Sequence, residues 1–459
     1  MLSWSGAGAL SLLGSGLLAA CSAESPSGSS TGSPAGGSTP AGTSGGGSSA
    51  GSSSAAASSA GGSQTGQSSG SGGASGTPIK VGASLSLTGS LASSALIHKT
   101  AGDVFVDRLN KNGGLLGRPV QWIVIDDQSQ NDKAAAAYER LITEEKVDLI
   151  SAPYGTGTTS AAMTVAQRYG YLFPNTTGSL TYQYSYAGQF PSWSSGRYPN
   201  ESIVSDLLDM LEESGGPLKK IAFVVNEFPG SNYVALGTDQ GDDKDRKGAI
   251  DVATDRGYEV MKVTYPIAIT DWAPIAAQVR SFAPDLIFNA GVGLDGSNLA
   301  QALQAVNFAP KGQFSLWSSP APLDGLGATS NDIMLAGLFL PTMPQAQTDT
   351  AKEIVAAYAE KAKADKTYPI FETQAASEWV AWEFLVQAVE GTKSLEHDKL
   401  IDWLATNGIT SELIGKLTFD KGANNYTGNT SIIEQLQDGV WQSVWPADKR
   451  SAKVVYPKK

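Results

Sequence analysis

From Ile79 onward, the sequence alternates between short β-rich runs and segments with the apolar spacing of helices. The run over residues 79–87 (IKVGASLSL) precedes a helical pattern over residues 94–112, and residues 120–125 form the next strand pattern. The same order continues to residue 317. Strands that alternate with helices predict parallel sheets covered on both faces and built from right-handed crossovers. We therefore expect an α/β fold.

The alternating pattern occurs twice, before and after a segment of different character. Residues 179–199 (SLTYQYSYAGQFPSWSSGRYP) are aromatic and interrupted by Gly and Pro, which is typical of a hinge or cleft segment. Two similar α/β units in tandem are therefore predicted. Because ligands of open α/β sheets bind outside the carboxyl ends of the strands, the residues just past each strand are the candidate site residues.

The N-terminal region has a different composition. Residues 9–20 are mostly apolar, are too short to span a bilayer and end in small residues, which predicts a signal peptide over residues 1–20. Leu-Ala-Ala-Cys ending at Cys21 resembles a bacterial lipobox, so we expect lipid on this single cysteine, the alternative being a buried or incidental thiol. No Lys or Arg precedes the apolar run, which leaves open a natural start further upstream.

The rest of the N-terminal region is dominated by small residues. Residues 22–77 are nearly all Ser, Gly, Ala, Thr and Pro, so they lack the apolar area that offsets the entropy of ordering a chain. Together with the cysteine, residues 21–78 are predicted to form a disordered tether.

Composition also excludes several function classes. A net charge of −12 opposes binding to nucleic acid. One cysteine and two histidines leave too few ligands for most transition-metal centres, and no cofactor is expected. The two histidines, His98 and His397, lie in helical patterns and are expected to have no chemical role.

The first candidate loop is PYGTGTTSAAM, which follows a predicted strand. Its residues Tyr154, Thr156, Gly157 and Thr158 lead into a helix that we expect to be capped by Thr158 or Thr159. Backbone N–H groups at a helix start bind anionic oxygens, so this loop is a candidate seat for a carboxylate. An ordinary capped helix is the alternative.

Two further loops follow strands. PNTTGS contributes Thr176, Thr177 and Gly178, whereas NEFPGSNY contributes Glu227 and Phe228. Such a loop alone is usually a turn, but three loops at equivalent strand ends favour one binding mouth.

A glycine-rich loop, AGVGLDG, follows Asn289 and satisfies G-x-G-x-x-G between a strand and a helix. The acidic residue that a dinucleotide site requires about 20 positions later is missing, because the sequence there is LWSSPAP. We therefore reject nicotinamide binding and interpret the glycines as a close approach of the backbone to a different ligand.

After the tether, the chain resembles the solute-binding proteins of branched-chain amino acid ABC transporters, the Leu/Ile/Val-binding type. The resemblance covers roughly residues 79–445 and rests on three stretches: NKNGGLLGRPVQWIVIDDQSQNDKAAAAYERLI, ITDWAPIAAQVRSFAPDLIFNAG and LIGKLTFDKG. It implies a class I periplasmic binding protein fold, in which two Rossmann-like lobes are joined by a three-strand hinge. The implied crossings lie near Ser195, Pro341 and Tyr426, with lobe 1 over residues 79–198 and 341–425 and lobe 2 over residues 199–340 and 426–459.

The resemblance also implies roles for the loop residues. In the family, the loops matching residues 154–158 and 176–178 seat the ligand carboxylate, and the second lobe adds a ring, here Phe228 or Tyr233, and contacts past Asn289 such as Val292. The glutamate that often binds the ligand ammonium is missing from LWSSPAP. Either Glu227 or Asp295 replaces it, or the ligand has no ammonium. In the second case Arg197, Trp193 and Trp317 would suit an aromatic or other carboxylic acid.

The function implied by the resemblance is capture of a small polar organic solute and its delivery to ABC permease subunits. We expect a monomer, held outside the bacterial cell membrane by a lipid anchor, that catalyses no reaction. The alternatives are a ligand-sensing ectodomain that partners a signalling receptor and, with no catalytic motif to support it, a hydrolase.

Overall fold

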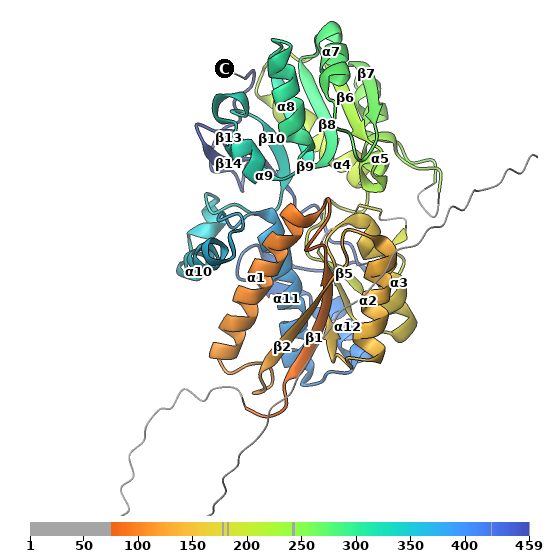
Figure 1. The fold of residues 1–459 in the computed structure, drawn as a ribbon, viewed down its shortest axis with the longest axis vertical. Helices are drawn as coiled ribbons and strands as arrows, with labels where there is room; N and C mark the ends of the chain where they lie inside the picture. The colour runs from red at the N-terminus through yellow and green to blue at the C-terminus, as the bar shows by residue number, and fades with distance from the viewer. Residues whose placement is uncertain (1–74, 177–178, 181–182, 241–243, 424, 459) are drawn as a thin grey trace, which may run out of the picture. The chain divides into compact units, whose positions relative to one another are not determined.

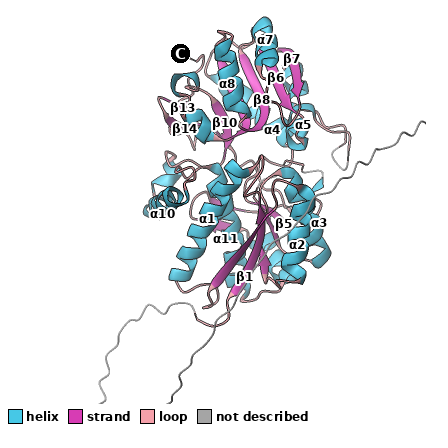
Figure 2. Cartoon of the chain, in the orientation of Figure 1, coloured by secondary structure: helices cyan, strands magenta, loops and turns pink. Residues whose placement is uncertain are grey.

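The computed structural model describes residues 75–458, except for residues 177–178, 181–182, 241–243 and 424 (Figure 1). The predicted signal peptide, the lipidation site Cys21, nearly all of the tether, and Thr177 and Gly178 lie outside the described residues. The described chain forms the expected α/β fold, with helices on both sides of parallel strands (Figure 2).

The first lobe is built on a small parallel sheet with the strand order β2-β1-β3. Its strands are β1 (Ile79–Leu85), β2 (Val120–Asp126) and β3 (Leu149–Ile150), and a separate parallel pair consists of β4 (Phe173–Asn175) and β5 (Gln189–Pro191). The helices that precede the first connection are α1 (Ala92–Lys111), α2 (Asn131–Thr143) and α3 (Thr156–Tyr169), and those after the second connection are α10 (Asp349–Asp365), α11 (Thr373–Thr392) and α12 (His397–Asn407). A short antiparallel pair, β11 (Ile409–Ser411) and β12 (Gly415–Leu417), follows α12.

The second lobe is built on a seven-stranded sheet with the order β14-β13-β10-β9-β8-β6-β7. Its strands are β6 (Lys220–Asn226), β7 (Glu259–Tyr265), β8 (Leu286–Gly293), β9 (Gly312–Ser318), β10 (Met334–Gly337), β13 (Ile432–Gln437) and β14 (Val440–Trp445). Its helices are α4 (Pro199–Glu213), α5 (Pro229–Leu236), α6 (Ala249–Asp255), α7 (Ala273–Phe282), α8 (Asp295–Ala305) and α9 (Pro320–Asp324).

The second sheet differs from the expected parallel sheet at one edge. Strands β7, β6, β8, β9 and β10 are parallel, whereas β13 pairs antiparallel with β10 and with β14. The hairpin turn between β13 and β14 is Asp438-Gly439, and both residues have positive φ angles, of 50° and 80°. This backbone matches the twist of two antiparallel strands, so the chain returns to the sheet at its edge.

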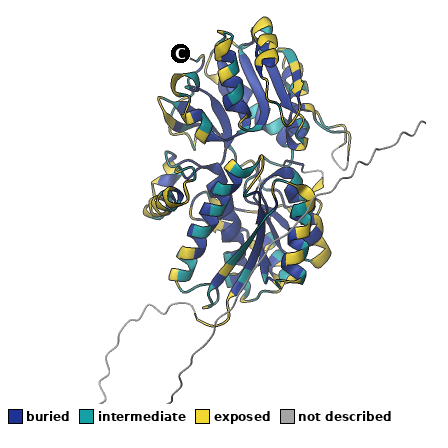
Figure 3. Cartoon of the chain, in the orientation of Figure 1, coloured by how far each residue is buried: buried dark blue, intermediate teal, exposed yellow. Residues whose placement is uncertain are grey.

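Alternate residues of the central strands bury opposite faces of the second sheet. In β6, Phe223 belongs to a core cluster with Phe288 and Phe314, whereas its neighbours Ala222 and Val224 pack in a different cluster under α7 and α8. Both faces are therefore apolar, as a parallel sheet between two helical layers requires. Figure 3 shows the strands buried and the outer helix faces exposed.

Three segments connect the two lobes. They run from β5 to α4, from β10 to α10 and from β12 to β13, and they contain the predicted crossing residues Ser195, Pro341 and Tyr426. A backbone bridge between Ser195 and Asn429 joins the first and third segments. The residue boundaries of the lobes stay a prediction. Among the helices of the described chain, none combines the length and the hydropathy needed to span a bilayer.

Candidate functional site

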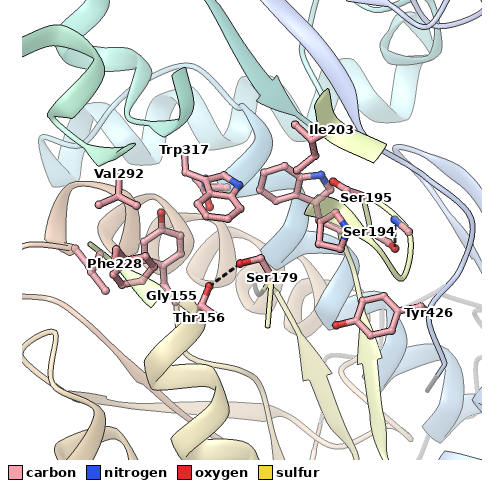
Figure 4. Close-up of a pocket in the computed structure, with 16 residues that line it drawn as sticks. Gly155, Thr156, Ser179, Ser194, Ser195, Ile203, Phe228, Val292, Trp317 and Tyr426 are labelled. Carbon is pink, nitrogen blue, oxygen red and sulfur yellow. Dashed lines mark hydrogen bonds between the residues drawn. The ribbon is translucent and has the colours of Figure 1, made fainter. Parts of the chain in front are cut away.

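A pocket lies where loops of both lobes meet, and we call it the cleft pocket (Figure 4). Its cavity volume is about 50 Å³. Its lining residues are Leu91, Tyr154, Gly155, Thr156, Ser179, Trp193, Ser194, Ser195, Gly196, Pro199, Ile203, Phe228, Val292, Trp317, Gln374 and Tyr426.

The loop after β3 reaches the pocket through Tyr154, Gly155 and Thr156. Gly155 is the N-cap residue of α3 and has φ 100° and ψ 144°, a conformation that favours glycine. The expected cap at Thr158 or Thr159 is wrong, because the helix begins at Thr156. The Thr158 hydroxyl instead donates to the carbonyl oxygen of Gly155 at 2.9 Å and also to that of Tyr154.

Tyr154 and Thr156 have different surroundings within this loop. The Tyr154 ring lies 5.0 Å from the imidazole of His98, and burial raises the pKa of its hydroxyl to about 12, so the hydroxyl stays protonated and neutral. The Thr156 Oγ1 lies 3.5 Å from the Ser179 Oγ. Both hydroxyl groups are neutral and can donate or accept hydrogen bonds, and the Tyr154 hydroxyl interacts with the Ser94 side chain.

A buried network in lobe 2 positions Phe228 and Val292. The Asp295 Oδ2 accepts hydrogen bonds from the Asn226 Nδ2 at 2.8 Å and the Val292 backbone N–H at 2.9 Å. The Tyr265 hydroxyl donates to the same oxygen at 2.9 Å, and the Asn226 Oδ1 accepts from the Phe228 N–H at 2.8 Å. Burial raises the pKa of Asp295, while these three donors oppose that shift. Two pocket residues thus depend on one buried carboxyl group.

The glycine-rich loop packs closely against side chains of this network. A Cβ on Gly291 would lie 2.6 Å from the Asn289 Oδ1 and 2.8 Å from the Tyr265 hydroxyl oxygen. A Cβ on Gly296 would lie 2.6 Å from the Ser318 Oγ. At these two of the three glycines of the loop, the missing side chain makes room for other side chains of the protein and not for a ligand, which corrects the expectation there.

The two lobes touch along one side of the pocket, which we call the seam. A Cβ on Gly230 of α5 would lie 2.6 Å from the Ser179 Oγ and 2.9 Å from the Thr156 Oγ1. The Ser319 Oγ, just past β9, lies 3.1 Å from the Ser93 Oγ and 3.3 Å from the Ser94 Oγ of α1. These contacts hold the lobes together around the pocket, so this is a closed arrangement.

The structure brings together five of the candidate residues: Tyr154, Thr156, Phe228, Val292 and Trp317 line the cleft pocket. Five other described candidates do not line it: Gly157, Thr158, Thr176, Arg197 and Glu227. The buried Thr176 hydroxyl donates to the Pro153 carbonyl at 3.2 Å, and Glu227 is exposed. Arg197 lies at a second pocket with Tyr426, Thr418 and Asp420.

Other lining residues were not among the site predictions. They come from the hinge segments (Ser194, Ser195, Gly196, Tyr426) and from helices (Ile203, Gln374), and Leu91 precedes α1. Gln374 stands next to His98, whose Nε2 lies 3.0 Å from the Gln374 Oε1. His98 is fully buried beside the pocket, which the sequence did not indicate.

The described residues contain no group of three or more His, Cys, Asp or Glu side chains that could hold a metal ion. The site instead combines rings with hydroxyl, amide and backbone groups. This chemistry suits recognition of a small organic molecule.

Comparison with known proteins gives a family match. A family model described as "Periplasmic binding protein" matches residues 78–439.

Solved structures of similar fold span nearly the whole described chain. A leucine-binding protein of Thermotoga maritima has a TM-score of 0.64 at 16% identity, over 80% of this chain and 97% of its own. A branched-chain amino acid transporter binding protein of Streptococcus pneumoniae, in complex with isoleucine, has a TM-score of 0.65 at 19% identity. The match covers 81% of this chain and 100% of that protein's chain. An ABC transporter solute-binding protein from R. palustris, in complex with benzoate, has a TM-score of 0.66 at 17% identity. The match covers 83% of this chain and 98% of that protein's chain.

Proposed function

Because the chain belongs to the periplasmic binding protein family, we propose that it is the extracytoplasmic solute receptor of an ABC importer. In this proposal it captures a small organic solute in the cleft pocket and presents it to the permease subunits. The observation that carries the proposal is the pocket itself, whose lining comes from both lobes and closes along the seam. Closure of two lobes on a ligand gives a partner a distinct surface to recognise.

The proposed binding residues are those that the pocket brings together, Tyr154, Thr156, Phe228, Val292 and Trp317, with Gln374 and Ser179 in addition. The described site offers rings and neutral hydrogen-bonding groups. We therefore propose that the solute is released unchanged and that no cofactor takes part. As a separate point, we propose that the receptor acts as a monomer.

The test is calorimetric titration of the full chain against amino acids, aromatic acids, amides and ureas. We expect saturable binding at one solute per chain, with the solute recovered unchanged by mass spectrometry. Phe228→Ala should weaken binding at least about tenfold, a change of about 1.4 kcal/mol. Phe308→Ala is the matched control, since Phe308 is also partly buried in lobe 2 but packs away from the cleft pocket. Conversion of the solute, no saturable binding, or equal effects of the two variants would contradict the proposal.

We further propose that lipid on Cys21 anchors the receptor. The support is the small-residue motif before this single cysteine, together with the long Ser/Gly-rich stretch after it. When the full chain is expressed in a bacterium with an alkyne fatty acid, we expect label on the wild type and none on Cys21→Ser. Label that persists in the variant would contradict the anchor without affecting the solute site.

A further inference from the structure

The lining of the cleft pocket has no charged side chain among its described residues. Its polar groups are the hydroxyls of three serines, one threonine and two tyrosines, one glutamine amide, two indole N–H groups, and backbone groups. A ligand ammonium buried there would meet no carboxylate and a ligand carboxylate would meet no cationic side chain, so either charge would depend on hydrogen bonds from neutral groups.

The carboxyl groups near the pocket are all committed elsewhere. Asp295 accepts three hydrogen bonds from its own network, and Glu227 is exposed outside the lining. Glu372 is the buried N-cap residue of α11, and burial raises its pKa to about 8, so its carboxyl group is mostly neutral at pH 7. Glu378 lies behind Gln374, paired with His98. None of these four groups provides a counter-ion in the pocket.

Five aromatic rings line the pocket: Tyr154, Trp193, Phe228, Trp317 and Tyr426. Figure 4 shows Trp317 between Phe228 on one side and Tyr426 on the other. The Trp193 indole N–H is already used, since it donates to the Ser431 Oγ at 2.9 Å. Rings in this number favour a flat aromatic ligand, which can stack or pack edge to face against them.

A buried chain of side chains fixes the orientation of the Gln374 amide. The Glu378 Oε1 accepts a hydrogen bond from the Trp382 Nε1 at 2.9 Å. The Glu378 Oε2 lies 3.2 Å from the His98 Nδ1. The His98 Nε2 lies 3.0 Å from the Gln374 Oε1. An amide oxygen can only accept, so the His98 Nε2 carries a hydrogen and donates it to the Gln374 Oε1, while the Nδ1 faces Glu378.

This chain leaves the Gln374 Nε2 as one polar atom that can meet a ligand, in addition to the hydroxyl groups of the pocket wall. Its oxygen is held by His98, and the nitrogen has no hydrogen-bond partner within the described part of the chain. An amide nitrogen can only donate, so the group that it binds must be an acceptor such as a carboxylate or carbonyl oxygen.

We infer that the cleft pocket selects aromatic solutes that have a carboxylate or carbonyl group and no ammonium, and that Gln374, oriented by His98 and Glu378, binds that polar group. This inference rests on the proposed solute-binding function and gives its ligand class. Gln374 is thus a specificity-determining residue, and His98 is a positioning residue.

The experiment measures dissociation constants of the full chain for pairs that differ only in an ammonium. The pairs are 3-phenylpropionate with phenylalanine, phenylacetate with phenylglycine, and 4-methylpentanoate with leucine. We expect each acid without the ammonium to bind at least about tenfold more tightly than its amino acid, and the aromatic acids to bind more tightly than the aliphatic one. An amino acid that binds as tightly as its partner acid would overturn the inference and leave the receptor function intact. Absence of binding to every probe here and in the wider panel would instead contradict the receptor function.

The role of Gln374 is tested with Gln374→Glu on 3-phenylpropionate and its neutral amide. The new carboxylate repels the acid but accepts a hydrogen bond from the amide, so we expect at least about tenfold weaker binding of the acid and less than about threefold for the amide. Gln278→Glu, on the exposed face of α7, is the control for added charge. Equal losses for acid and amide would indicate a structural role. If this variant does not fold, Gln374→Met serves instead, and unchanged affinity for the acid would overturn the assignment.

Discussion

Gly230 in α5 lies against Thr156 in α3, at a distance that leaves no room for a Cβ, since that atom would stand 2.9 Å from the Thr156 Oγ1. Helix α5 follows β6 of the second lobe and helix α3 follows β3 of the first lobe, so this contact joins the lobes. The close approach therefore places the backbone of one lobe against a proposed binding residue of the other.

We predict that Gly230→Ala weakens solute binding by about tenfold or more. The added methyl group would meet Thr156 and Ser179 when the lobes close, whereas the open form has room for it. Titration calorimetry with the best-bound solute measures the effect. The melting temperature without solute should change little or rise, because alanine is the better helix residue.

Gly325→Ala is the matched control for this variant. Gly325 has φ −69°, and its Cβ would lie 3.5 Å from the Pro322 carbonyl oxygen, an ordinary contact within lobe 2. Its solute affinity should equal that of the wild type. Equal affinities for the wild type and Gly230→Ala would show that the seam does not close on the ligand.

A second prediction concerns the hydroxyl groups of the seam. Ser319→Ala removes the oxygen that lies 3.1 Å from the Ser93 Oγ and 3.3 Å from the Ser94 Oγ. A neutral hydrogen bond contributes about 1 kcal/mol, so we expect solute affinity to fall about fivefold through faster release, measured by stopped-flow Trp fluorescence. Ser297→Ala loses a bond inside lobe 2 and should leave the release rate unchanged. Similar release rates in Ser319→Ala and the wild type would contradict the prediction.

A third prediction concerns the buried carboxyl group under the pocket. Asp295→Asn replaces an acceptor of three hydrogen bonds with an amide that cannot accept all three, so we expect the free energy of unfolding to fall by about 2 kcal/mol. Solute affinity should fall as well, because Val292 and Phe228 lose their support. Urea unfolding and titration measure the two effects. Asp402→Asn, on an exposed side chain, should change neither quantity, and wild-type stability in Asp295→Asn would refute the prediction.

Periodicity and strand ends predict a large part of the fold. Strands β1 and β2 were expected close to their observed bounds, because buried parallel strands are continuous apolar runs. Strand β5 was not expected, because it lies in the aromatic segment that was interpreted as a hinge or cleft segment. The α/β fold and the family are confirmed. Phe228, Val292 and Trp317 follow or end strands, and this position alone brings them to the pocket.

The other pocket residues lack such a signal. Gln374 lies in the first turn of α11, more than 200 residues from Tyr154, and Ile203 lies on α4, so only packing brings them to the cleft. Arg197 was predicted from its charge, but a charge does not indicate where the side chain points. The structure places Arg197 at the second pocket. The Asp438-Gly439 turn between two alternating runs would have indicated the C-terminal hairpin.

The final prediction concerns pH and the two buried glutamates beside the second connection. Glu372 is the N-cap residue of α11, and burial raises its pKa from 4.5 to about 8. Glu434 in β13 is also buried, which raises its pKa, and the neighbouring Glu372 adds to this shift. The Glu372 carboxyl group is therefore mostly protonated in the folded protein at pH 7.

We expect Glu372→Gln to flatten the pH dependence of stability. A folded-state pKa above the unfolded value of 4.5 contributes stability that is fully present below pH 4.5 and is lost as pH rises toward 8. At about 1.4 kcal/mol per pKa unit, the loss for this group is of the order of 4 kcal/mol. Urea unfolding between pH 5 and pH 8 should therefore show a smaller decline in the variant than in the wild type. Glu353→Gln, on the exposed face of α10, should keep the wild-type decline, and an unchanged decline in Glu372→Gln would show that this carboxyl group is already ionised in the folded state.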